Sequence, residues 1–389
     1  MQIQTPGRGP DSRRGRAILM LCHFVGMVDL IALPVWVGAL VQHYGFDLEH
    51  AGMTVTAFLL GAVGASLFAA PRFNRLPRTA CVAGGYGIAA LAFLLASRTT
   101  GFGPLAALHL AAGLATGTAL SVTHGTIGRS ARPHRLFAIV GTGLGIGAVA
   151  FYAAVPPAVA AHGGPTLFTV FGGLMALAAL AATAFPKVAS EQEGRESSGP
   201  LPRAAWFAIL GVSLMALNQA LTYSMLDRIG IMRGFGQERV NALLVVCGLV
   251  NLLPAAVAGL LEKRLDPVRV ALVAAPLQAA LAVTIALATG YAQYALAASV
   301  YAAVLIFMHT FLFGLIARLD PSGRALASTP AMMMTGSAIG PALAGAVVMR
   351  FGFGGQAALA LAVGACATLC FALVARRGRG SAPVAAAAE

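Results

Sequence analysis

Asp29 is the only acidic residue that lies well inside a long apolar stretch of this chain. The stretch covers residues 17–43, and Asp29 lies 12 residues past Ala17, about 18 Å along a helix that rises ~1.5 Å per residue. An ionisable group in hydrocarbon costs at least ~2.5–3.5 kcal/mol on insertion scales, so this position indicates a function. Because a low dielectric favours the neutral carboxyl form, we predict that Asp29 carries a proton. The alternative is a structural Asp that bonds a neighbouring helix.

Asn218 and Gln219 lie midway along another apolar stretch, and Arg228 lies at the end of it. The amides could donate hydrogen bonds to a substrate or to Asp29, or they could hold helices together. Arg228 could bind a substrate anion, or its side chain could extend to the membrane interface. We include all three among the residues that could line a substrate cavity.

Four histidines also fall within apolar stretches: His23, His109, His124 and His309. Histidine titrates near neutral pH, so His23 and His124 are candidates for a proton relay. His309 has aromatic neighbours, and together with Trp36 it could line an apolar, adaptable substrate cavity. The alternative is that these histidines only satisfy hydrogen bonds and that the aromatic side chains pack or face lipid.

The overall composition is that of an integral membrane protein. The chain has 389 residues, of which 58% are hydrophobic and only 10% charged, and its mean hydropathy is +0.82. Soluble domains contain about 25% charged residues. A soluble protein of this size could not cover so much apolar surface, so composition excludes soluble, disordered and disulfide-scaffold classes.

The uncharged stretches predict twelve transmembrane helices, since one crossing needs ~20 apolar residues. They are 17–43 (interrupted by Asp29), 51–71, 79–97, 99–128, 136–186 (two helices), 204–226, 240–261, 270–317 (two helices), 325–349 and 351–375. Strands of a membrane barrel would alternate over about ten residues, and these stretches do not. We therefore expect an all-α fold.

The positions of Lys and Arg predict the orientation. With a cytoplasmic N-terminus, 21 of the 26 basic residues fall on the inner side, as the positive-inside rule requires. We expect cytoplasmic tails at 1–16 and 376–389, six-helix bundles at 17–185 and 204–375, and a cytoplasmic central loop at 186–203. The inner arginines are expected to contact anionic lipid. Because they are scattered over several loops and form no basic face, nucleic-acid binding is excluded.

A shift of 189 residues aligns several positions of the two halves. It places Gly45-Phe46 on Gly234-Phe235, Arg129 on Arg318, and Asp29 on Asn218. One offset that serves loops on both sides of the membrane indicates a duplicated six-helix unit.

Pairs of glycines four residues apart are typical of closely packed membrane helices. We assign this packing role to Gly141 and Gly145, and to Gly336 and Gly340 with Pro341. They are not phosphate-binding loops, because no Gly-Lys-Ser/Thr follows them.

Two stretches make the chain resemble the major facilitator superfamily: residues 320–324 (Asp-Pro-Ser-Gly-Arg) followed by a glycine-rich helix at 336–345, and the glycine series at 141–147. The resemblance implies two six-helix halves and transport by alternating access. It also implies gating loops, in which we place Arg72, Arg75, Arg129 and Arg318. In that family the loop between helices 2 and 3 holds an acid that latches the halves, but here residues 70–78 contain none. Glu262 and Asp266 of the second half are assigned this role instead.

Together these features predict a secondary transporter and not an enzyme. The chain has no ATP-binding motif, no paired acids, no metal-ligand cluster and no Gly-x-Ser-x-Gly nucleophile, so no cofactor or metal is expected. We expect a monomer in the inner (plasma) membrane that exports a small amphipathic or apolar molecule in exchange for protons. The alternatives are proton-coupled uptake of a small organic anion and, third, a non-transporting membrane protein.

Overall fold

The structure is a computed structural model, and it describes residues 9–73, 75–131, 133–187, 202–261, 264–319 and 324–379. All regular secondary structure in these ranges is helical. The first half contains α1 Arg13–Gly26, α2 Val28–Tyr44, α3 Leu48–Ala69, the 3-10 turn η1 Ala70–Arg72, α4 Arg78–Ala96, α5 Phe102–Gly128, α6 Pro133–His162 and α7 Pro165–Ala182. The second contains α8 Arg203–Tyr223, α9 Leu226–Met232, α10 Gln237–Val250, α11 Pro254–Leu261, α12 Pro267–Leu287, α13 Tyr291–Leu319 and α14 Arg324–Arg379.

Ten segments of the described chain are long and apolar enough to cross a membrane. Two of them, Arg13–Tyr44 and Arg203–Met232, each join two helices across a short break. The helices α10 and α11 have 14 and 8 residues, so each is shorter than a span. The segment Met333–Arg376 counts once, although Gly352 inside it has a φ of 64° and interrupts the helix. The all-α prediction is confirmed; the count of twelve stays a prediction.

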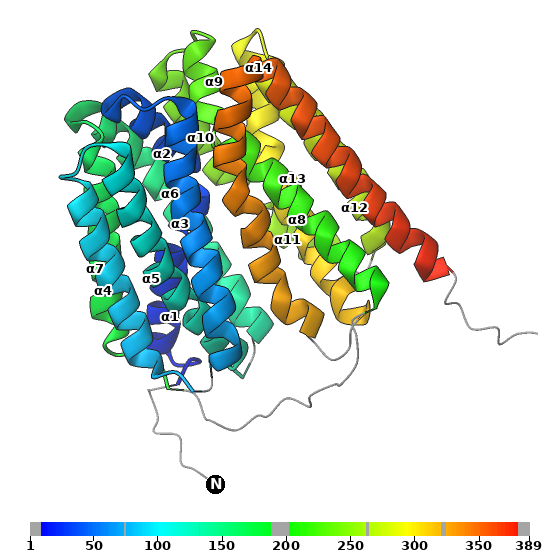
Figure 1. The fold of residues 1–389 in the computed structure, drawn as a ribbon. Coiled ribbons are helices and arrows are strands. Elements are labelled where there is room, and N and C mark those ends of the chain that lie inside the picture. The colour runs from blue at the N-terminus through cyan, green and yellow to red at the C-terminus, as the bar shows by residue number, and fades with distance from the viewer. Residues whose placement is uncertain are drawn as a thin grey trace, which may run out of the picture.

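The helices form two bundles that lie side by side (Figure 1). One holds α1 to α7 and the other α8 to α14. The first residues of α1 and α8 and the last residues of α7 and α14 lie at the same end of the molecule. Following the predicted orientation, we call this the inner end. The opposite end, where residues 45–47 join α2 to α3, is the outer end.

Corresponding turns at the outer end have the same backbone conformation. Gly45 follows α2 with a φ of 69°, and Gly234 follows α9 with a φ of 77°. Non-glycine residues adopt this left-handed region rarely. The 189-residue offset therefore joins two positions that make the same turn.

The two bundles touch through glycines. Gly52 of α3 packs on the backbone of Pro341, and Gly345 of α14 packs on the carbonyl of Leu48. A side chain at either glycine would overlap backbone atoms, so α3 and α14 approach as closely as small residues allow. The two ribbons diverge towards the inner end (Figure 1).

Candidate functional site

The first predicted span is broken near its middle, directly before Asp29. Met27, with φ −108° and ψ 10°, separates α1 from α2. Asp29 is therefore in the first turn of α2, where backbone N–H groups lack helical acceptors and favour a negative charge. Its side chain is only 3% exposed, and its Oδ1 atom has no hydrogen-bond partner within the described chain. An unpaired carboxyl oxygen in this position can accept a proton.

Span 1 runs very close to α4 at this level. The Tyr86 hydroxyl donates a hydrogen bond to the carbonyl of Cys22 at 2.5 Å. A Cβ atom at Gly26 would lie 2.6 Å from the same hydroxyl, so any larger residue would displace the Tyr86 side chain. Tyr86 is also close enough to Asp29 to interact with it electrostatically. The acid thus lies near α4 of the first bundle, close to an uncharged hydroxyl group.

The structure brings the two predicted relay histidines together. Nδ1 of His23 on α1 lies 2.9 Å from Nε2 of His124 on α5, and the ring centroids are 5.1 Å apart. One nitrogen must donate and the other accept, so a single proton lies between the rings. Such a pair can exchange a proton, whereas two cationic rings would repel each other.

His109 is held in one neutral form. Its Nδ1 lies 2.7 Å from the carbonyl of Leu105, which can only accept, so Nδ1 carries the hydrogen. Nε2 then accepts the hydrogen bond from Trp36 Nε1 at 3.1 Å. A second proton on this ring would face the indole N–H. His109 is therefore a satisfied structural histidine.

We predicted that Trp36 lines a substrate cavity, and the structure places it elsewhere. Its ring is fully buried against Phe58, Phe93 and Phe171 at centroid distances of 5.3, 5.8 and 4.8 Å. All these neighbours belong to the first bundle, and they fill the space around the indole. Because the N–H group also needs a partner when buried, His109 completes the site.

The two amides of α8 face their own bundle. Asn218 is buried, and its Nδ2 donates to the carbonyl of Ala360 on α14 at 3.2 Å. Gln219 accepts from Nε2 of Gln278 at 3.2 Å. Of the alternatives for Asn218, the described residues show a bond between helices and none to Asp29. Sequence reasoning missed Gln278, although an amide midway along the first of the two helices expected in the stretch 270–317 was a signal for it.

The other two residues assigned to the substrate cavity are half-buried. His309 lies on α13 and Arg228 on α9. The Nε atom of Arg228 is buried and has no hydrogen-bond partner among the described residues. A donor in this state could serve an anion.

The arginines of the predicted gating loops bind helix ends and an aromatic ring. Nη1 of Arg72 donates to the carbonyl of Phe68 at 2.9 Å, and the guanidinium lies 3.9 Å from the centre of that ring. Arg129 lies 5.4 Å from the ring of Phe73. Arg75 belongs to the same turn, where its N–H donates to the Arg72 carbonyl.

Of the two acids assigned to the gating loop of the second half, the structure describes only Asp266. Asp266 caps α12, because its Oδ1 accepts from the N–H of Arg269 at 2.9 Å. Glu262 and the segment 320–323 lie outside the described residues, as does most of the predicted central loop. The side chain of Arg318 is likewise not described.

Four of the five predicted packing residues lie in tight helix contacts. Gly336 packs on the carbonyl of Ser213, Gly340 on Ala220, and Gly145 on Leu252, while Pro341 meets Gly52. Gly141 has no such contact among the described residues: an added Cβ would meet nothing within 4 Å, and the residue is exposed.

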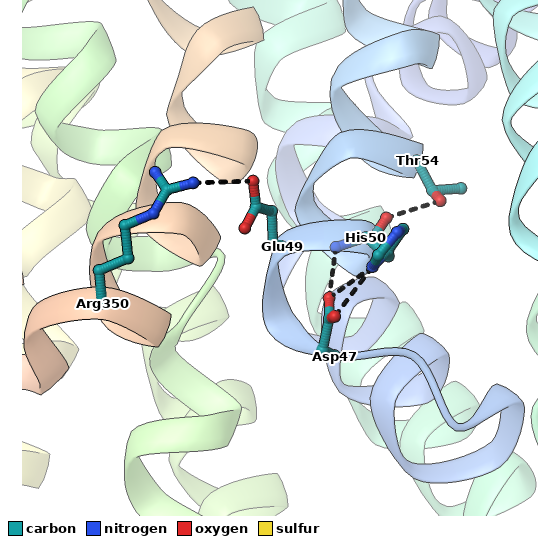
Figure 2. Close-up of polar contacts among 5 residues, drawn as sticks. All are labelled: Asp47, Glu49, His50, Thr54 and Arg350. Atoms are coloured by element: carbon teal, nitrogen blue, oxygen red, sulfur yellow. Dashed lines mark hydrogen bonds and ion pairs between the residues drawn. The ribbon is translucent and has the colours of Figure 1, made fainter.

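At the outer end, polar contacts join the two bundles. Arg350 Nη2 of α14 lies 3.7 Å from Glu49 Oε1 of α3, as Figure 2 shows. The Thr56 hydroxyl accepts from the backbone N–H of Ala342 at 3.1 Å. Deeper in the molecule, at the level of Ile31, the hydroxyls of Tyr152 and Tyr223 are 2.8 Å apart. These pairs join the two bundles from the outer end towards the middle.

Comparison with known proteins gives a family and a fold. A family model of the Major Facilitator Superfamily matches residues 19–322. A solved structure of the nucleoside transporter NupG, a point mutant, is 14% identical, covers 92% of this chain and 99% of its own, and has a TM-score of 0.72. Among curated proteins no match is found.

A bacterial homologue of the human lysosomal transporter Spinster is also similar in structure. Its inward-facing, unoccupied form is 13% identical, covers 95% of this chain and 98% of its own, and has a TM-score of 0.73. Its inward-facing, occupied form is 14% identical with a TM-score of 0.70 and covers 96% and 98%. At such identities the likeness shows the fold alone. With the family model matched over most of its length, this chain belongs to the major facilitator superfamily, and it is a transporter and not an enzyme.

Proposed function

We propose that this protein is a proton-coupled exporter of small amphipathic or apolar molecules, which works by alternating access in the plasma membrane. In this proposal the chain crosses the membrane twelve times and both ends are cytoplasmic. The short pair α10 and α11 makes one crossing, and α14 makes two on either side of Gly352. The predicted bundles 17–185 and 204–375 are the moving halves.

The single observation that carries the proposal is the state of Asp29. It is buried, it directly follows the break in span 1, and one of its oxygens lacks a partner among the described residues. A permanently charged carboxylate in this position would be costly without a cation. A carboxyl group that gains and loses a proton during the cycle explains both observations. It is neutral while it is buried, and the oxygen without a partner is where the proton binds.

The direction and the substrate class rest on the surroundings of Asp29. Tyr86, the side chain of α4 that lies close to this part of span 1, is uncharged. A surrounding without a fixed positive charge does not attract an anion, which favours an amphipathic or apolar solute. Exchange of that solute for an incoming proton would drive export.

The test is transport in proteoliposomes with an imposed pH gradient, using the amphipathic dye ethidium as the probe. Asp29→Asn keeps the size and the hydrogen-bonding capacity but fixes the neutral state. We expect the variant to lose gradient-driven accumulation and to keep dye-for-dye exchange at zero gradient. Asp29→Glu, which still titrates, should keep part of the gradient response. A full gradient response in Asp29→Asn would overturn the role of Asp29 in coupling.

A second function, uptake of a small organic anion, is favoured by Arg228. Its buried Nε has no hydrogen-bond partner among the described residues, and a guanidinium binds carboxylates well. Counterflow of a radiolabelled dicarboxylate such as succinate tests this reading. Succinate counterflow that is abolished in Arg228→Gln, with ethidium inactive, would replace export by uptake.

A further inference from the structure

Span 7 has the same construction as span 1. Helix α8 ends at Tyr223 and α9 begins at Leu226, so a short break divides this span too. Asp227 is the second residue of α9, as Asp29 is the second residue of α2. Asp227 is 4% exposed. Each half thus buries an acid directly after a break in its first span.

Asp227 differs from Asp29 because it lies on the seam between the two bundles. A Cβ atom at Gly38 of α2 would be 2.6 Å from Asp227 Oδ2 and 3.1 Å from its Cγ. The carboxyl group therefore rests on bare backbone of the other half, in a space that only glycine leaves free. Any separation of α2 from α9 would uncover it.

A chain of amides joins this buried acid to the surface. Gln237 Nε2 lies 3.0 Å from both Asp227 Oδ1 and Asn241 Oδ1. The Oε1 atom of Gln237 faces Nε2 of Gln42, on the other half, at 3.4 Å, and Gln42 is exposed. The acid is thus close to outer water, and its neighbours change when the halves part.

Few charged or titratable groups face Asp227. Arg228, on the same helix, and Tyr294, on α13, are close enough to interact with it electrostatically. The side chains that reach it from α10 and α2 are neutral. Residues 280–287, the outer part of α12, include no titratable side chain. With one nearby cation and no bidentate pair, burial disfavours the charged form.

We propose that Asp227 is a second proton site of this transporter, which holds the outer seam closed when protonated and gains water when the seam opens. The inference deepens the proposed function and rests on it for its link to transport. The coupling follows from linkage: a proton that binds one conformation better shifts the population towards it. Acid then favours closure, and alkaline pH favours opening at the outer end.

Hydrogen–deuterium exchange of the protein in lipid nanodiscs tests this without any solute or gradient. The readout is the exchange rate of peptides within residues 226–242, corrected for the intrinsic effect of pH on amide chemistry. We expect the rate to rise by at least about threefold from about pH 5.5 to about pH 8, because opening exposes these amides.

Three variants make the test specific. Asp227→Asn should exchange slowly at both pH values, since its side chain stays neutral. Gly38→Ala should exchange quickly at both, since its methyl group would push the Asp227 carboxyl group out of its closed position. Glu238→Gln removes an exposed acid of α10 and should keep the pH dependence of the wild type. Thermal unfolding of each variant confirms that it is folded.

The proposal is overturned if wild-type exchange in this region does not change with pH, or if Asp227→Asn keeps the change. Both outcomes are independent of the transport assay. If hydrogen–deuterium exchange behaves as expected while Asp29→Asn retains the full gradient response, the results support the outer proton site and contradict the coupling role of Asp29.

Discussion

The Nδ1 atom of His23 lies 2.9 Å from Nε2 of His124 and joins the end of α1 to α5. His23 is in the last turn of α1, where the helix dipole favours a positive charge. Asp29 follows on the other side of the break at Met27. A proton held between the two rings is therefore placed one helix turn and a break away from the carboxyl group that we propose to titrate.

This pair predicts a loss of coupling without a loss of binding. His23→Gln and His124→Gln keep a hydrogen bond between the helices but cannot carry a proton. We expect each variant to lose most of its pH-gradient response in proteoliposomes and to keep dye-for-dye exchange at zero gradient. An unchanged gradient response in both would show that the pair only joins α1 to α5.

His109→Gln is the matched control, because His109 is fixed as a neutral ring by Trp36 and Leu105. A Gln side chain can still accept a hydrogen bond, but it does not replace the imidazole ring that packs against Phe93 and Phe168, and lost packing in a buried position lowers stability. We expect a lower thermal unfolding temperature in detergent and an intact response to the pH gradient. A lost gradient response with full stability would instead place His109 on the proton path.

The close contact of α3 with α14 predicts that Gly52→Ala prevents closure at the outer end. The new methyl group would overlap the backbone of Pro341 and lie 3.0 Å from the Cα of Ala342, and backbone cannot move aside as a side chain can. We expect the folded variant to lose transport. Cross-linking of cysteines introduced at Glu49 and Arg350, which face each other across the seam (Figure 2), should fall with it.

Gly64→Ala is the control for this substitution. It lies on the same helix, and an added Cβ there meets nothing within 4 Å. We expect wild-type transport, with stability unchanged or raised because alanine favours helix. Equal losses in both variants would mean that α3 does not tolerate alanine in general, and would remove the argument for a seam.

The class of fold could be predicted from the sequence, because it depends on the length and polarity of continuous stretches of the chain. Uncharged stretches of about 20 residues predict helices through the length that the bilayer requires, and ten candidate spans bear this out. The resemblance carried by residues 141–147 and 320–345 named the family correctly. The breaks at Met27 and Ser224, in the first span of each half, left no such signal, because neither residue is a typical helix breaker.

The site could be predicted only in part, because a residue type does not say which face of a helix points where. Trp36 has the character of a cavity residue, but Phe58, Phe93 and Phe171 surround it. Asp227 gave no such signal, because it lies next to Arg228 at the end of an apolar stretch. Its contact with Gly38 joins positions 189 residues apart, and no local pattern predicts such a contact.

The turn before α3 gives a pH-dependent contribution to stability. Asp47 Oδ1 accepts from the N–H of His50 at 2.7 Å and caps the helix, and this bond lowers the pKa of Asp47. A carboxyl group with a lowered pKa stabilises the fold above its unfolded pKa and loses this effect as pH falls through the folded value. Asp47→Ala should cost about 1 kcal/mol near neutral pH.

The measurement is thermal unfolding in detergent from neutral pH to below about pH 4, the ordinary range of an Asp side chain. The difference between wild type and Asp47→Ala should shrink towards the acid end. Asp47→Asn, which caps well but does not titrate, should unfold near the wild type at neutral pH. A difference that is constant with pH would mean that the cap does not depend on the charge.

Restoring the missing acid of the loop between α3 and α4 should change the rate of transport more than the apparent affinity. Ala70 is exposed in η1, near a loop rich in arginine, and Ala70→Glu adds a carboxylate there. An exposed ion pair is worth about 0.2–1 kcal/mol, so the new pair would shift the balance of inward- and outward-facing states by up to roughly fivefold. Residue 70 lies at the inner end, just after α3, whereas Asp29 lies near the middle of span 1 on α2. The concentration of ethidium that gives half the maximal rate should therefore stay the same.

Ala70→Gln has nearly the same shape without the charge and should behave as the wild type. If the Gln variant changes the maximal rate as much as the Glu variant, the effect comes from bulk at residue 70, and this loop holds no electrostatic latch.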